Sequence, residues 1–185
     1  MISEITTGRV LAVCAARGHR FSKPPLLSIR LLPGLGVEGD AHCGATVKHP
    51  YLARKNPNAP NLRQVHLMHR ELFDEVAAKG FTVKPGDLGE NITTEGIDLL
   101  GLSEGTLLYL GDAAVIEVTG IRNPCVQIDR FQNGLLKAML DKDANGKLMR
   151  KSGIMSIVKT GGDVRPGDIV RAVPPDGPLR PLPLL

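Results

Sequence analysis

Glycine and proline recur so often in this chain that they limit the length of any regular element. The 185 residues include 21 glycines and 14 prolines. Both residues disfavour helix interiors and favour turns, so their frequency predicts short strands and loops rather than long helices. Aromatic residues make up only 3% of the chain, so Val, Ile, Leu, Ala and Met have to build the core. We therefore expect a mainly β domain with two or three short helices.

Apolar runs between the turn residues predict where the strands lie. We expect strands at residues 9–15, 26–31, 63–67, 106–110, 113–119, 154–159 and 168–173. Gly111 and Asp112 separate two of these runs, which is the best hairpin signal in the chain. The clearest helix covers residues 71–79 and stops before Gly80, and a shorter helix is expected at 134–141. Such a set of strands closes most easily into a barrel or a sandwich.

One core is expected, because no linker and no internal repeat divides the chain. We predict a single domain over residues 1–173 and a proline-rich tail over 174–185, either an extended strap or disordered. Residues 48–61 contain three prolines and predict an extended surface loop, either a lid or a variable surface. The chain has no run of apolar residues that could span a bilayer, and its start does not look like a secretory signal. A cytoplasmic location without membrane contact is therefore expected.

The charge of the chain suits an anionic partner, but the pattern of residues argues against nucleic acid. The net charge is +4, and the basic residues are spread along the chain instead of clustered. Recognition of single-stranded RNA uses aromatic side chains for stacking, and two Tyr and four Phe supply few of them. An anionic small molecule remains the better explanation of the charge.

Cys125 is the most interesting of three cysteines, an odd number that argues against a disulfide framework. It follows Arg122, Asn123 and Pro124. Asn is a strong helix N-cap and Pro is favoured at the first helical position, so Cys125 is expected to open a short helix. A helix N-terminus and a neighbouring arginine both favour the thiolate, which is the nucleophilic and metal-binding form. The local sequence equally allows a buried structural cysteine, whereas Cys14 is expected in the core and Cys43 in a loop.

Two patterns in the sequence resemble metal sites but fit them poorly. A zinc site would draw on His42, Cys43, His49, His66 and His69, whose spacings match no standard zinc motif. The segment 141–146 resembles the first half of a calcium loop, but Ser152 stands where a bidentate Glu is needed. We interpret that segment as a polar turn.

Several sequence blocks, taken in order, resemble one known family. They are GVEGDAHCG at 36–44, NLRQVHL at 61–67, PGDLGENITTEGIDL at 85–99, GTLLYLGDAAVIEVTGIRNPC at 105–125 and GIMSIVKTGGDVRPGD at 153–168. This order and spacing is similar to the MOSC domain, named for the C-terminal domain of molybdenum-cofactor sulfurases. The resemblance covers about residues 8–170. It implies a closed β-barrel-like fold of the pyruvate-kinase-barrel type with a few helices.

The resemblance also implies roles for individual residues. Cys125 corresponds to the functional thiol of the family and would ligate molybdenum through the molybdenum cofactor, a molybdopterin. Asp40 and His42 match a Gly-Asp-x-His element and are candidates to orient substrate or move a proton, which His42 can do more readily near neutral pH. The candidates for cofactor binding are Arg63, Arg122, Asn123, Gly89, Glu90 and Asn91, with Lys48 as a further cation for the phosphate.

Three functions follow from the resemblance and stay open at this point. In the first, the protein reduces small N-hydroxylated compounds with molybdenum cofactor, and a separate protein donates the electrons. In the second, Cys125 is a sulfur carrier that receives a persulfide from a pyridoxal-phosphate-dependent cysteine desulfurase. In the third, the chain is a non-catalytic module that binds cofactor or a partner. The first two need the same thiolate, so the sequence does not separate them.

Overall fold

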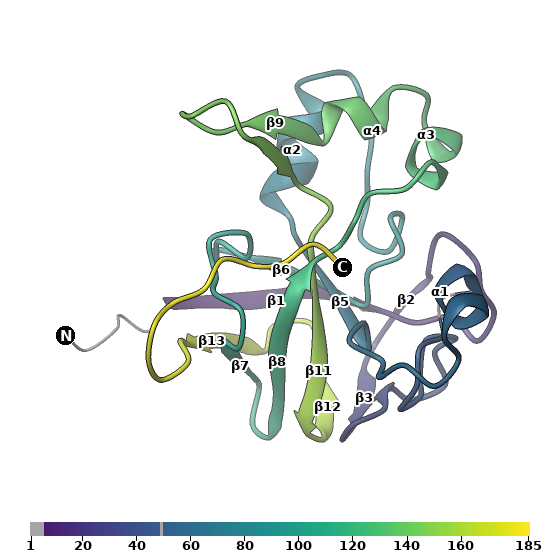
Figure 1. Cartoon of the computed structure of the whole chain (residues 1–185), viewed down its shortest axis with the longest axis vertical. Coiled ribbons are helices and arrows are strands. Elements are labelled where there is room, and N and C mark those ends of the chain that lie inside the picture. The colour runs from purple at the N-terminus through teal and green to yellow at the C-terminus, as the bar shows by residue number, and fades with distance from the viewer. Residues whose placement is uncertain (1–5, 49) are drawn as a thin grey trace.

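The fold is built on a closed barrel of seven strands (Figure 1). A computed structural model describes residues 6–48 and 50–185. Around the barrel the order is β1 (Thr6–Cys14), β13 (Ile169–Val173), β7 (Leu107–Leu110), β8 (Ala114–Ile121), β11 (Ile154–Thr160), β5 (Val65–His69) and β6 (Ile92–Glu95). Strand β1 closes the ring by pairing with both β6 and β13. The predicted mainly β, barrel-like fold is confirmed.

Alternation of side chains along the strands explains why the barrel is filled rather than hollow. Along β8, buried residues alternate with partly exposed ones, as expected when one face of a strand packs inward. The inward residues of the barrel form one apolar cluster that includes Leu67, Leu108 and Ile116. The Gly111–Asp112 hairpin joins β7 to β8 as predicted.

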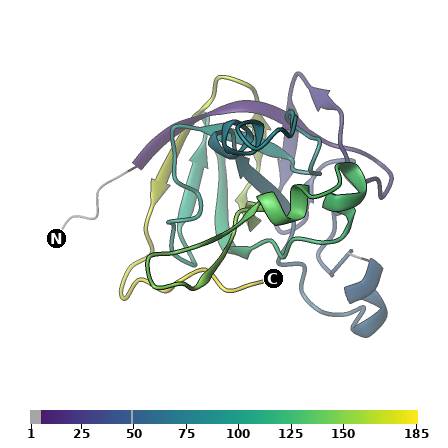
Figure 2. The same ribbon diagram turned by 90° about the horizontal axis from the view of Figure 1, so that it is seen from above.

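Smaller elements cover the barrel (Figure 1, Figure 2). Strand β2 (Pro25–Leu26) pairs with β1, and β12 (Gly162–Val164), β3 (Ile29–Leu32) and β4 (Gly36–Val37) form a three-stranded sheet. Over one end of the barrel lie α2 (Glu71–Ala77), α3 (Gln127–Phe131), α4 (Leu135–Ala138) and the hairpin of β9 (Leu140–Lys142) and β10 (Leu148–Arg150). These helices share a second apolar cluster that includes Met68, Leu72, Ile128 and Leu135.

Three local expectations need correction. Residues 48–61 contain the helix α1 (Pro50–Lys55), because proline suits the first helical position and the two basic residues in its last turn complement the helix dipole. The helix expected at 134–141 ends at Ala138, since the next residues pair in the β9–β10 hairpin. The strand expected at 26–31 is divided into β2 and β3, with Leu27 exposed between them.

Residues 174–185, called here the C-terminal strap, run extended across the barrel (Figure 1). The main-chain N–H of Glu104 donates to the carbonyl of Arg180, and the chain then reaches Ile121 at the end of β8. Leu182 packs against the barrel core. Within the described residues, no helix is long and apolar enough to cross a membrane.

Candidate functional site

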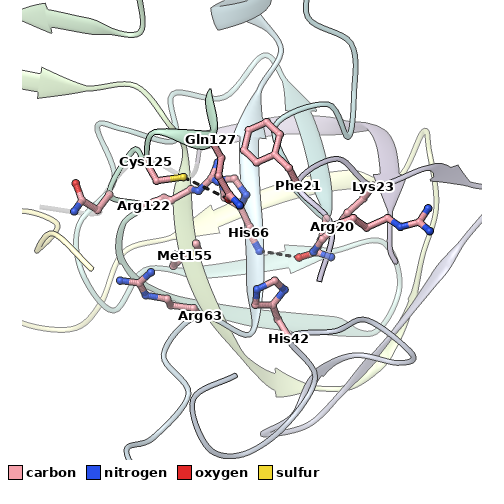
Figure 3. A pocket seen from close by; sticks show the side chains of 13 residues that line it. Arg20, Phe21, Lys23, His42, Arg63, His66, Arg122, Cys125, Gln127 and Met155 are labelled. Carbon is pink, nitrogen blue, oxygen red and sulfur yellow. Dashed lines mark hydrogen bonds between the residues drawn. The ribbon is translucent and has the colours of Figure 1, made fainter. Parts of the chain in front are cut away.

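A cavity of about 110 Å³ lies between one end of the barrel and the loops that follow β8 and precede β6 (Figure 3). It brings together seven of the residues singled out from the sequence, which are His42, Arg63, Gly89, Asn91, Arg122, Asn123 and Cys125. Six further residues complete its wall, which are Arg20, Phe21, Lys23, His66, Gln127 and Met155. Lys48, Asp40 and Glu90 are not among the residues that line it.

Cys125 lies on the cavity wall just before helix α3 and is half-buried. Its carbonyl accepts a hydrogen bond from the N–H of Ile128, and its thiol Sγ lies 3.7 Å from Gln127 Oε1, to which it can donate (Figure 3). The expected helix cap at Asn123 is wrong, because α3 begins at Gln127 with Val126 in the capping position. Asn123 instead lies in the segment that follows β8, and its N–H donates to the carbonyl of Leu185.

Arg63 and Arg122 give part of the cavity wall a positive charge, and Arg20 and Lys23 also line it. Arg122 donates from Nη1 to the carbonyl of Leu88 at 2.8 Å, and its guanidinium lies 6.0 Å from the centre of the Phe21 ring. Burial, together with the neighbouring charge of Arg122, lowers the pKa of Arg63. Burial also lowers the pKa of Arg122, although the nearby Cys125 and Glu90 oppose that shift. An arginine stays charged even so.

Neither Arg63 nor Arg122 has an ion-pair partner among the described residues, although Glu90 lies near Arg122. In the described part of the chain, Arg63 and Arg122 form no ion pair, and no Asp or Glu lines the wall. A partly buried cation without a counter-charge is costly, and an anionic ligand would remove that cost. The thiol and the two guanidiniums therefore suit an anion that also offers a soft metal or an electrophilic sulfur.

Asp40 lies behind the cavity wall and organises it. Its carboxylate accepts hydrogen bonds from the main-chain N–H of Ala16 and His42 and from Asn91 Nδ2, and it pairs with Lys23 Nζ at 2.9 Å. Burial alone would raise the pKa of Asp40, but hydrogen bonds from His42 and the charge of Lys23 outweigh it and hold the pKa well below its usual range. Asp40 is therefore a carboxylate that fixes its neighbours.

The position of His42 follows from this arrangement. Its ring Nδ1 lies 3.3 Å from Asp40 Oδ1, and its ring stacks edge-on against His19 with centroids 5.3 Å apart. If Nδ1 carries the proton and donates to Asp40, Nε2 is left as the nitrogen that can exchange a proton. Asn61 supports the same segment, since its Nδ2 donates to the carbonyls of His42 and Gly44.

Comparison with known proteins gives the family. The family model of the MOSC domain matches residues 54–171. This chain belongs to the MOSC domain family. The solved structure of the YuaD protein from Bacillus subtilis superimposes with a TM-score of 0.74 at 23% identity, over 91% of this chain and 97% of that one. YiiM from Escherichia coli gives a TM-score of 0.60 at 20% identity, over 93% and 73%. These likenesses show the fold, and no curated protein matches the chain.

The Gly-Glu-Asn element of this MOSC domain divides between the cavity and the core. Gly89 lines the cavity with a φ of +84°, and a Cβ there would lie 2.5 Å from the carbonyl of Phe21. Asn91 also lines it, accepting from the N–H of His66 and donating to the carbonyl of Cys14. Glu90 is fully buried away from the cavity, where its Oε1 accepts from the N–H of Gly86. Burial raises the pKa of Glu90, which fits a structural role in that turn.

Sequence reasoning missed His66 as a member of the wall and considered it only for zinc. Its Nε2 lies 2.8 Å from the carbonyl of Ser152, and burial together with the charge of Arg122 lowers its pKa well below the usual value. His66 is therefore neutral near pH 7. Met155 is its partner across the β5–β11 pairing, so the strand register would have placed both on the wall. Lys23 carries no local signal that would have singled it out.

Proposed function

We propose that this MOSC-domain protein binds molybdenum cofactor in the cavity, with the Cys125 thiolate as a ligand of molybdenum, and reduces small N-hydroxylated compounds. The observation that carries the proposal is the combination of residues on one wall. The Cys125 thiol shares that wall with Arg63 and Arg122, and in the described part of the chain neither arginine forms an ion pair and no carboxylate lines the wall.

The residues fit the chemistry of such a cofactor. A thiolate is a soft ligand for a thiol-binding metal, and arginine recognises phosphate through paired hydrogen bonds. A cavity of about 110 Å³ is smaller than the roughly 300–1,000 Å³ of enclosed ligand sites, so it would enclose only part of the cofactor. When bound, the cofactor supplies the two-electron redox chemistry, and the protein supplies binding and orientation.

Each residue then has a defined task. Arg63 and Arg122 would hold the anionic part of the cofactor and keep it from dissociating. His42, with Nδ1 held by Asp40, would deliver a proton from Nε2 to the oxygen that leaves the N-hydroxylated nitrogen. Reduction of such a substrate consumes two electrons and two protons and releases water. The electrons would come from a separate donor protein.

An activity assay with matched cysteine variants tests this proposal. The wild type, Cys125→Ser and Cys43→Ser are loaded with cofactor and assayed for reduction of a hydroxylamine-type base with a chemical electron donor. We expect Cys43→Ser to match the wild type and Cys125→Ser to be inactive. Equal activity of Cys125→Ser and wild type would refute the assignment of Cys125. Turnover in none of them, despite bound cofactor, would favour a non-catalytic binding module.

The exposure of Cys125 supports a second candidate, the sulfur carrier. The thiol is half-buried and its hydrogen-bond partner Gln127 is exposed, so a partner protein could approach it. This function requires a persulfide on Cys125 after incubation with a cysteine desulfurase and cysteine, seen as the mass of one added sulfur. Absence of that adduct under anaerobic conditions would exclude it.

A further inference from the structure

The end of the C-terminal strap forms a short ladder beside the last residues of β8. The N–H of Ile121 donates to the carbonyl of Pro183 at 2.8 Å, and the N–H of Leu185 donates to the carbonyl of Ile121 at 2.9 Å. The ladder continues beyond the strand, where the N–H of Asn123 donates to the carbonyl of Leu185 at 3.1 Å. Figure 1 shows this part of the strap, in yellow, next to the end of β8.

The topology of the barrel explains why this edge needs a partner. β7 pairs with β8 as far as Glu117, and Gly105 and Thr106 extend the hydrogen bonding to Val118, whereas β8 continues to Ile121. Main-chain groups at an unpaired strand edge otherwise depend on water or attract another chain. The strap forms hydrogen bonds with the main-chain N–H and carbonyl of Ile121 and with the N–H of Asn123.

Gly120 allows this close approach. A Cβ at Gly120 would lie 2.5 Å from the carbonyl oxygen of Pro183 and 2.8 Å from Cγ of Leu185. Gly120 is not one of the glycines with positive φ, so its backbone conformation is open to alanine. The main reason for glycine at this position is therefore room for the strap.

The strap is also connected to the functional thiol. Asn123, which it holds, is separated from Cys125 only by Pro124, whose ring fixes φ. On the other side, Cys125 is held by the hydrogen bond from Ile128 to its carbonyl. Movement of Asn123 would therefore move Cys125 relative to the cavity.

We propose that residues 183–185 are a positioning strand for Cys125, which keeps the thiol on the cavity wall by holding the backbone of residues 121–123. When the strap leaves the end of β8, Ile121 and Asn123 lose these hydrogen bonds and the Cys125 segment gains freedom to move. This role of the strap matters for function only if Cys125 is the functional thiol, as in the proposed function. The test measures the reactivity of the Cys125 thiol without any cofactor. The positioning role of the strap and the cofactor-binding role of Cys125 can therefore fail separately.

The test measures alkylation of Cys125 by iodoacetamide with peptide mass spectrometry. All variants carry Cys43→Ser, which leaves Cys125 and Cys14 as the remaining cysteines. Burial raises the pKa of the Cys14 thiol to about 12, so its reaction reports global unfolding. One variant deletes residues 183–185, and a second, Gly120→Ala, pushes the strap away in the full chain. Leu179→Ala, an exposed residue of the same strap, is the matched control.

We expect Cys125 to react at least about fivefold faster in both variants, because the loss of even one of the three main-chain hydrogen bonds corresponds to that factor. Cys14 stays unreacted and Leu179→Ala behaves as the background protein. An unchanged Cys125 rate in both variants would overturn the proposal. So would parallel reaction of Cys14 and Cys125, because the strap would then stabilise only the fold as a whole.

Discussion

Replacement of Asp40 by Asn tests how far the buried ion pair with Lys23 supports the cavity wall. The side chains are 1% and 4% exposed, and Asp40 also accepts hydrogen bonds from Ala16, His42 and Asn91. Asn keeps the shape but removes the charge, and it turns one acceptor into a donor that faces other donors. Lys23 is then a buried cation without a partner, which costs about 3–5 kcal/mol.

The measurement is guanidinium unfolding followed by far-UV circular dichroism at pH 7. The expected loss corresponds to a fall in Tm of roughly 6–20 °C for a chain of this size. Asp163→Asn, which breaks ion pairs with the exposed Arg30 and Arg165, is the control and is expected to cost about 0–1 kcal/mol for each pair. A cost for Asp40→Asn no larger than that of Asp163→Asn would refute the reasoning.

The pH dependence of the same experiment gives an independent check. Because the pKa of Asp40 is held below its usual range, its stabilisation is complete above the ordinary carboxyl pKa. It is lost as the pH falls from about 4 towards the lower pKa of the folded protein. The difference in unfolding free energy between wild type and Asp40→Asn should therefore be constant from pH 7 to pH 5 and shrink below about pH 4. A difference that changes between pH 7 and pH 5 would assign the effect to another group.

Two further predictions follow from the site and its supporting turns. Arg63→Gln and Arg122→Gln each remove a charge from the cavity wall and should weaken cofactor binding by about 10-fold or more, as measured by cofactor titration. The thermal stability of Arg63→Gln should change little. Unchanged affinity in both variants would show that these arginines do not bind the anion. Gly86→Ala should lower the free energy of unfolding by at least about 2 kcal/mol more than Gly146→Ala, as measured by denaturant unfolding. Both glycines have positive φ, but only the Cβ at position 86 would meet backbone, at 2.1 Å from the carbonyl oxygen of Lys23. Equal losses would mean that the turn at Gly86 relaxes freely.

The elements that could be predicted from the sequence are those that depend on local patterns of residues. The β7–β8 hairpin and helix α2 depend on neighbouring residues, and both occur where they were expected, although α2 ends at Ala77, two residues before the predicted end at 79. The family blocks around Cys125 and Arg122 identified two residues of the cavity wall. Short-range sequence information is sufficient where the structure depends on residues a few positions apart.

The contacts that could not be predicted from the sequence join residues that are far apart in the chain. Lys23 lies between β1 and β2 and pairs with Asp40, which follows β4, so the tertiary fold is needed to bring them together. His66 lies beside Met155 through the register of β5 and β11, two strands that are far apart in the sequence. The start of α3 was misjudged because Asn123 pairs with Leu185, whereas the Asn-Pro pattern suggested a helix cap. No local motif encodes such contacts.

In the proposed function, Cys125 binds molybdenum through its cofactor. The most direct test is metal and pterin analysis of protein purified anaerobically from a molybdenum-replete host, with wild type beside Cys125→Ser. We expect near-stoichiometric molybdenum in the wild type and none in the variant, with both folded to the same extent. Equal molybdenum in the two proteins would contradict it, and so would molybdenum in neither when the wild type alone accepts sulfur from a desulfurase.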